Sequence, residues 1–156
     1  MQCVKFKKSP DTAEMIHLKE LFVRRVKPKI DKYPESHVLF DTYKELSDFS
    51  LKDGAREQRA QNGLNATPGN FDIHDEMSLK RTTLRELFCS IPTKRRLTTY
   101  FAEAVLSEYN GDSNHVVIVS YGTNIAINKP HTLDESFRSH RHEEADTQIP
   151  LHIIKV

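Results

Sequence analysis

Residues 115–128 read HVVIVSYGTNIAIN and carry the clearest β-strand pattern in this chain. Two short apolar runs, rich in valine and isoleucine, flank the polar stretch from Ser120 to Asn124. Gly122 can adopt the backbone conformation that a tight turn needs, so the pattern predicts two strands joined by a turn. A second apolar run, HVLFD at 37–41, has the length of a buried strand and ends in an acid.

Apolar residues at helical spacing surround both strand patterns. Helices are expected over 11–27, 79–88 and 93–109, which show this spacing, and over 51–61. Pro28 and Pro34 are expected to end the first helix, whereas Pro92 suits the first turn of the last helix. Helices that alternate with short strands favour an α/β fold. We expect one domain over residues 1–156, with a flexible loop at about 62–76, where Gly, Pro, Asn and Asp accumulate.

Composition restricts the function classes that fit this chain. It has 23 Lys and Arg against 22 Asp and Glu, a formal net charge of +1, so any basic surface must be local. No apolar run approaches the ~20 residues of a membrane helix, and the first residues lack the apolar stretch of a secretory signal. Two cysteines exclude a disulfide scaffold. We expect a soluble intracellular protein, nuclear or cytoplasmic, with no membrane partner. The sequence indicates no particular oligomeric state.

Four acids are candidates for a metal site. Asp41 closes the strand pattern HVLFD, and functional groups of α/β sheets gather just beyond the carboxyl ends of the strands. Glu143, Glu144 and Asp146 occupy three of four successive positions, where carboxylates repel one another unless a cation shares them. Mg²⁺ or Mn²⁺ is the natural cation for such ligands, and it would support phosphodiester hydrolysis. The alternative is that these acids only complement a helix dipole or cap a turn.

Two groups of basic residues are candidates for nucleic-acid binding. Both could hold the phosphates of a strand that reaches the acids, or could simply form solvated surface. The group formed by residues 94–96 lies at the start of a predicted helix, where the helix dipole does not favour cations. The two groups are Lys52, Arg56 and Arg59 at helical spacing, and Lys94, Arg95 and Arg96.

Other kinds of site fit the sequence poorly. His142 and Glu143 begin like the H-E-x-x-H zinc motif, but residue 146 is Asp, so the zinc spacing fails. No Walker A, G-x-G-x-x-G or G-x-S-x-G pattern is present, and we therefore expect no small-molecule cofactor.

Three segments resemble blocks of a known group of proteins. HEEADTQIPLHI, at 142–153, resembles the S-H-E-E-A-D-T-R-x-L-L-H-A block of mobile-element-associated, uncharacterised invertebrate proteins. HVLFDTYKEL with SLKDGAREQR, from 37 to 59, resembles their V-V-F-D-x-Y and S-I-K-x-x-x-R-x-x-R blocks. FCSIPTKRRLTTYFAEAVLSEY, at 88–109, resembles their P-x-N-K-x-x-L-x-x-F-L helix. Those proteins in turn look like distant PIN-like, flap-endonuclease-type nucleases.

The resemblance implies a three-layer, PIN-like (Rossmann-like) α/β sandwich that cleaves DNA or RNA with Mg²⁺ or Mn²⁺. It implies that Asp41, Glu144 and Asp146 are catalytic metal ligands, with Glu143 as a further candidate. Arg56 and Arg59 resemble the basic gateway helix of these nucleases, and Lys52 accompanies them. No T-x-D-x-D strand follows the acid block, so we expect a truncated domain that is incomplete at both ends. The alternative is a non-catalytic relic that binds nucleic acid or protein.

Overall fold

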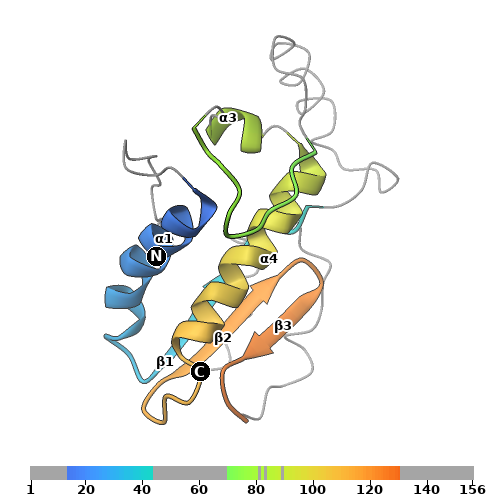
Figure 1. Ribbon diagram of the computed structural model, residues 1–156. Helices are drawn as coiled ribbons and strands as arrows, with labels where there is room; N and C mark the ends of the chain where they lie inside the picture. Colours follow the sequence, from blue (N-terminus) through green and yellow to red (C-terminus); the bar gives the residue numbers. More distant parts are fainter. Residues whose placement is uncertain (1–13, 44–69, 81, 83, 89, 131–156) are drawn as a thin grey trace.

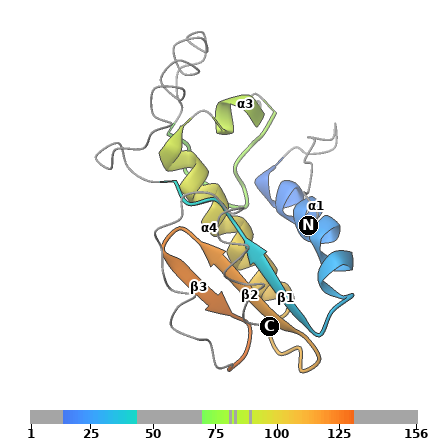
Figure 2. The same ribbon diagram turned by 180° about the vertical axis from the view of Figure 1, so that it is seen from behind.

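The computed structural model describes residues 14–43, 70–80, 82, 84–88 and 90–130. The helices and strands of these residues lie in two layers, seen from opposite sides in Figures 1 and 2. In chain order they are α1 (Met15–Ile30), β1 (Glu35–Leu39), α3 (Leu84–Leu87), α4 (Ile91–Glu108), β2 (Val116–Tyr121) and β3 (Asn124–Ile127). Within these ranges, no helix is long and apolar enough to cross a membrane.

The sheet has β2 at its centre. β1 pairs with β2 in parallel, and β3 pairs with β2 in antiparallel fashion. The β2–β3 connection is the tight turn that the sequence predicts, since Gly122 opens it with a φ of 55°. A glycine with positive φ in a two-residue loop suits the right-handed twist of the strands it joins. Both predicted strands of 115–128 are therefore confirmed.

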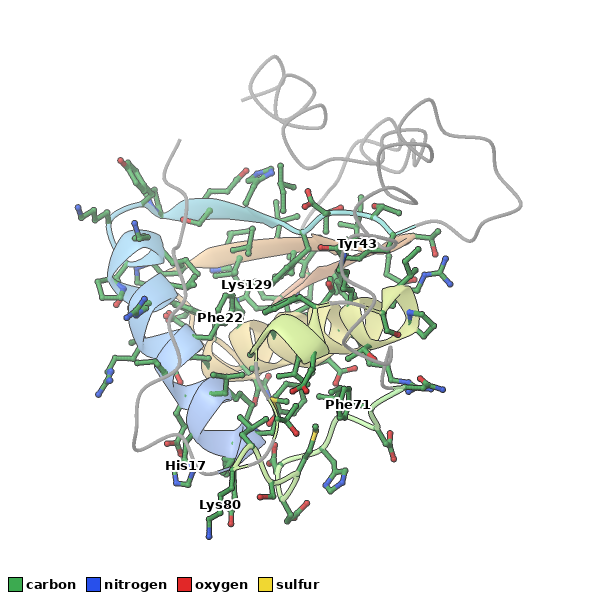
Figure 3. All side chains as sticks on the ribbon, turned by 90° about the horizontal axis from the view of Figure 1, so that it is seen from above. His17, Phe22, Tyr43, Phe71, Lys80 and Lys129 are labelled. Atoms are coloured by element: carbon green, nitrogen blue, oxygen red, sulfur yellow. The ribbon has the colours of Figure 1, made fainter. Side chains whose placement is uncertain are left out.

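α1 and α4 pack against one face of the sheet, as the view along the sheet shows (Figure 3). Val117 and Val119 of β2 are fully buried in a cluster with Val26 of α1 and Val105 of α4. Ile118 alternates onto the opposite face and is also buried. Parallel and antiparallel pairing in one sheet, with helices packed on it, confirms the α/β class. The three-layer sandwich stays a prediction.

α1 continues past the proline that was expected to end it. Pro28 lies inside the helix, which ends at Ile30. A proline removes one N–H donor from the helix, but Val26 and Ile30 on either side of it are buried in the core. The N–H of Asp31 still donates to the carbonyl of Lys27. Burial of these two side chains thus holds the last turn in place despite the missing hydrogen bond.

The start of α1 is held by a distant segment of the chain. Glu14 occupies the N-cap position without a side-chain hydrogen bond. Instead, the N–H groups of Met15 and Ile16 donate to the carbonyls of Met77 and Asp75, over 2.9 and 3.0 Å. The segment 70–80, which carries no helix or strand, therefore packs beside the first turn of α1.

α4 confirms the helix that was predicted over 93–109. Ser90 caps it, Pro92 lies in its first turn, and Gly111 follows its end with a φ of 81°. The helix predicted over 79–88 is wrong at its start. Leu79 is buried but not helical, and among the described residues of this range only Leu84–Leu87 forms a helical turn. The predicted helix 51–61 and residues 62–69 of the predicted loop lie outside the described residues.

Candidate functional site

Asp41 lies two residues beyond the end of β1. The strand was predicted over 37–41, but β1 ends at Leu39, because the pairing with β2 covers Glu35 to Leu39. The N–H of Phe40 still donates to the carbonyl of Ser120 over 2.9 Å. Asp41 follows directly and is exposed. Since β1 and β2 are parallel, it lies at the edge where the carboxyl ends of both strands meet.

Thr42 fastens this edge to the β2–β3 turn. Its hydroxyl donates to the carbonyl of Gly122 over 3.0 Å, and the residue is 7% exposed. A buried hydroxyl needs such an acceptor, because an unpaired one would be destabilising by about 1–3 kcal/mol. Thr42 therefore fixes the backbone that follows Asp41. It has no recognisable signal in the sequence, because the contact joins residues 80 positions apart.

The first turn of α4 contacts the same edge through two basic residues. The Nε of Arg95 donates to the carbonyl of Tyr43 over 2.5 Å. The ammonium of Lys94 lies 5.3 Å from the centre of the Tyr43 ring, within the range of a cation–π contact. Figure 3 shows Tyr43 at the end of the sheet that faces the start of α4. Lys94 and Arg95 therefore contact Tyr43, which lies two residues after Asp41 in the sequence.

Arg96 points to a different partner. Its Nη1 donates to the side-chain oxygen of Asn70 over 2.7 Å and to the carbonyl of Phe71 over 2.8 Å. The guanidinium is exposed. The segment that begins at Asn70 is therefore held at the same turn of α4 as Tyr43. All three predicted basic residues of this group lie at one end of the helix.

A small hydroxyl network supports this turn. Ser90 accepts from the N–H and from the hydroxyl of Thr93, over 3.3 and 3.2 Å. The Thr93 hydroxyl in turn accepts from the N–H of Phe71 over 3.3 Å. The charges nearby are mostly positive, and a helix N-terminus repels cations. The hydrogen bonds of Ser90 and Thr93 thus stabilise a turn that its own basic residues disfavour.

A second polar cluster lies between α1, α4 and the segment 70–80. Asp75 accepts from Lys19 over 2.6 Å and from the Tyr100 hydroxyl over 2.5 Å. The hydrogen bond from Lys19, and after it the one from Tyr100, lowers the pKa of Asp75. Burial, followed by the bond to Asp75, raises the pKa of Tyr100. Asp75 therefore stays ionised and Tyr100 stays protonated at neutral pH, which suits a structural fastening better than proton transfer.

The remaining predicted site residues lie outside the described part of the chain. Within that part, no three His, Cys, Asp or Glu side chains gather in a way that could hold a metal ion. The structure places Asp41 and the basic group of α4 at one edge of the sheet. The predicted residues outside the described ranges are Glu143, Glu144, Asp146, Lys52, Arg56 and Arg59.

Comparisons with known proteins add no further constraint. No family model matches the chain, and neither a curated protein nor a solved structure shows significant similarity to it.

Proposed function

We propose that this chain is a divalent-metal-dependent phosphodiester hydrolase domain of the PIN-like type, acting on DNA or RNA. The observation that carries the proposal is the position of Asp41, exposed beyond β1, at the end of the sheet that the basic first turn of α4 also contacts. Metal-assisted cleavage of a phosphodiester needs carboxylates and cations close together, because the carboxylates hold the metal while the cations hold the phosphate backbone.

Asp41 fits the role of a metal ligand by its chemistry. An exposed carboxylate offers oxygen donors of the kind that Mg²⁺ and Mn²⁺ prefer. In the proposal it holds the ion together with Glu144 and Asp146, and Glu143 is a further ligand. A bound ion would supply activated water and would stabilise charge on the leaving oxygen.

The basic residues have the role of phosphate contacts in this proposal. Lys94, Arg95 and Arg96 give the first turn of α4 a local positive charge in a chain whose net charge is only +1. A guanidinium carries five N–H donors, so the bonds of Arg96 to Asn70 and Phe71 leave it compatible with a phosphate oxygen. Lys52, Arg56 and Arg59 would extend the same positive surface.

Calorimetric titration of Mn²⁺ into the purified chain tests the proposal. We expect saturable binding that is lost in Asp41→Asn and in Asp146→Ala. Glu103→Gln is the matched control, because Glu103 is exposed on α4, away from the site, and the substitution removes the same charge. Cleavage of end-labelled single-stranded DNA and RNA, with Mn²⁺ or with EDTA, is measured on the same samples. A folded chain that shows neither saturable binding nor cleavage would refute the proposal.

A second candidate is a non-catalytic module that binds nucleic acid through the same edge, as a relic of a mobile-element protein would. The three consecutive basic residues of α4 favour it, because phosphate binding alone needs no acid. This module would bind an oligonucleotide in EDTA, with an affinity that falls steeply with salt, and would give no Mn²⁺ isotherm. The titration therefore separates the two candidates.

A further inference from the structure

The second half of α1 and the turn that follows it are strongly basic. Residues 24–33 read RRVKPKIDKY and contain five cations but only one acid. The whole chain has 23 Lys and Arg against 22 Asp and Glu, so the remaining residues hold more acids than cations. This stretch therefore carries a local excess of positive charge, which attracts anionic partners.

Two of these cations have no acidic partner within the described part of the chain. Lys27 is neutralised, because it pairs with Asp31 over 3.6 Å and with Glu108 over 3.3 Å. Arg24 and Lys32 are exposed, and no described carboxylate pairs with either of them. Their charges are therefore available to a bound anion.

Arg24 and Lys32 lie along one line of the helix. Arg24 and Pro28, four residues apart, are both exposed and share a face of α1. Lys32 follows four residues later, and the C-cap residue before it, Asp31, keeps a right-handed helical conformation. The two cations are thus separated by roughly two helical turns, about 12 Å, so one extended ligand can reach both.

Tyr33 presents an aromatic ring to solvent beside Lys32. The residue is 61% exposed, and no described residue makes a ring contact or a hydrogen bond with its side chain. Its backbone is fixed, because its N–H donates to the carbonyl of Ile30 over 3.0 Å and the N–H of Val116 donates to the carbonyl of Pro34 over 2.8 Å. A ring on a fixed backbone can bind a planar group with little loss of conformational entropy.

Cations beside an exposed ring suit single-stranded nucleic acid better than other anionic ligands. Its phosphates bind Lys and Arg, and its unpaired bases stack on aromatic rings, whereas the bases of a duplex are already stacked. A membrane surface requires apolar side chains next to the cations. The other exposed large apolar side chain of the described chain, Phe88, follows α3 and not α1.

We infer that Arg24, Lys32 and Tyr33, here called the α1 surface, bind single-stranded nucleic acid, with a base stacked on Tyr33 and phosphates held by the two cations. The α1 surface reaches the end of the sheet opposite to the first turn of α4 (Figures 1 and 2). β1, roughly 17 Å long, separates Tyr33 from Asp41. The inference rests on the proposed function and deepens it, because it adds a second contact for the nucleic acid and restricts the ligand to single strands.

Fluorescence anisotropy of the full chain with a labelled, unstructured single-stranded DNA, measured in EDTA, tests the role of Tyr33. We expect Tyr33→Ala to weaken binding about fivefold or more, the factor for one stacked base. Tyr33→Phe keeps the ring and should bind like the wild type. Binding to the matching duplex should be the same for the wild type and Tyr33→Ala.

The two cations have a separate signature in the salt dependence. Arg24→Gln and Lys32→Gln should each weaken binding and reduce the slope of log Kd against log salt concentration by about 0.7, the value for one phosphate contact to a single strand. Lys80→Gln is the matched control, because Lys80 is exposed and lies near the other end of α1 (Figure 3). Circular dichroism establishes that each variant is folded, and the salt slopes decide the test if Tyr33→Ala does not fold.

The α1 surface would be refuted if Tyr33→Ala, in a folded chain, bound the single strand as well as the wild type. Equal weakening by Lys80→Gln, or the same loss on the duplex, would also overturn it. Binding to anionic phospholipid vesicles that needs Tyr33, with no binding to the oligonucleotide, would assign the surface to a membrane instead. The Mn²⁺ titration of Tyr33→Ala should match the wild type, so a failed titration removes only the hydrolase and a lost dependence on Tyr33 removes only the α1 surface.

Discussion

Replacing Ser90 with alanine removes the cap of α4 and so tests what holds the basic turn in place. The Ser90 hydroxyl accepts from the N–H and from the hydroxyl of Thr93. Thr93 is 0% exposed, so water cannot replace the lost acceptor without a rearrangement. The basic residues that follow gain nothing from the helix dipole. The cap is therefore a local interaction that favours the helical turn.

The expected loss of stability has two parts. Replacing an N-cap serine by alanine typically lowers the free energy of unfolding by about 1 kcal/mol. Losing the hydrogen bond from the buried Thr93 hydroxyl to Ser90 adds about 1 kcal/mol, the usual net contribution of one such bond. A loss of about 2 kcal/mol in a chain of this size lowers the melting temperature by roughly 4–8 °C.

Thermal and urea unfolding, followed by circular dichroism, measure this loss. Ser107→Ala is the matched control, because Ser107 is exposed near the other end of the same helix. Ser90→Asp should retain most of the wild-type stability, since aspartate is an equally good cap and its charge suits the helix start. If Ser90→Ala and Ser107→Ala unfold within about 0.5 kcal/mol of each other, the cap does not hold the turn and this reasoning is wrong.

Two other substitutions test the packing of α1. Asp75→Asn should lower the melting temperature at pH 7, and the difference from the wild type should shrink as the pH falls below about 4. The sign follows from the lowered pKa of Asp75: its stabilising effect is complete above the ordinary carboxylate pKa and disappears as the pH falls through the folded value. Melting curves of the wild type and of Asp75→Asn from pH 7 to pH 2.5 measure this difference, and Asp72→Asn, at an exposed aspartate, is the control. A difference in melting temperature that stays constant over this pH range would contradict the prediction. Pro28→Ala should raise the free energy of unfolding by about 1 kcal/mol or more, because alanine restores an N–H donor inside α1. Pro34→Ala, outside the helix, should not stabilise the chain, and equal urea midpoints for the two variants would show that Pro28 does not weaken α1.

The parts of the fold that the sequence predicts well are those with local signals. The β2–β3 turn depends on Gly122, and α4 begins at a serine cap followed by Pro92. The parts that it predicts poorly depend on distant contacts. Burial of Ile30 carries α1 past Pro28, while the chain around buried Leu79 stays outside any helix although its apolar spacing is helical. Packing outweighs propensity at these positions.

The same contrast between local signals and distant contacts holds for the candidate site. Residue type and position after a strand pattern suffice to select Asp41, and a run of three cations selects Lys94, Arg95 and Arg96. Their partners have no such signal, because the bonds to Tyr43 and Asn70 join residues 52 and 26 positions apart. No periodicity links such distant positions.

The contacts of the first turn of α4 also determine what Asp41 can do. Arg95 and Arg96 donate at this turn to neutral acceptors, the carbonyl oxygens of Tyr43 and Phe71 and the side-chain oxygen of Asn70. Asp41 lies two residues before Tyr43, whose carbonyl and ring contact Arg95 and Lys94. Cations at this edge of the sheet attract a phosphate and repel a divalent cation. Asp41 alone would therefore bind an ion poorly, and the proposed hydrolase needs further carboxylates such as Glu144 and Asp146 at the same edge. The Mn²⁺ titration therefore tests Asp41→Asn and Asp146→Ala separately. If the two carboxylates coordinate the same ion, either substitution alone should abolish Mn²⁺ binding.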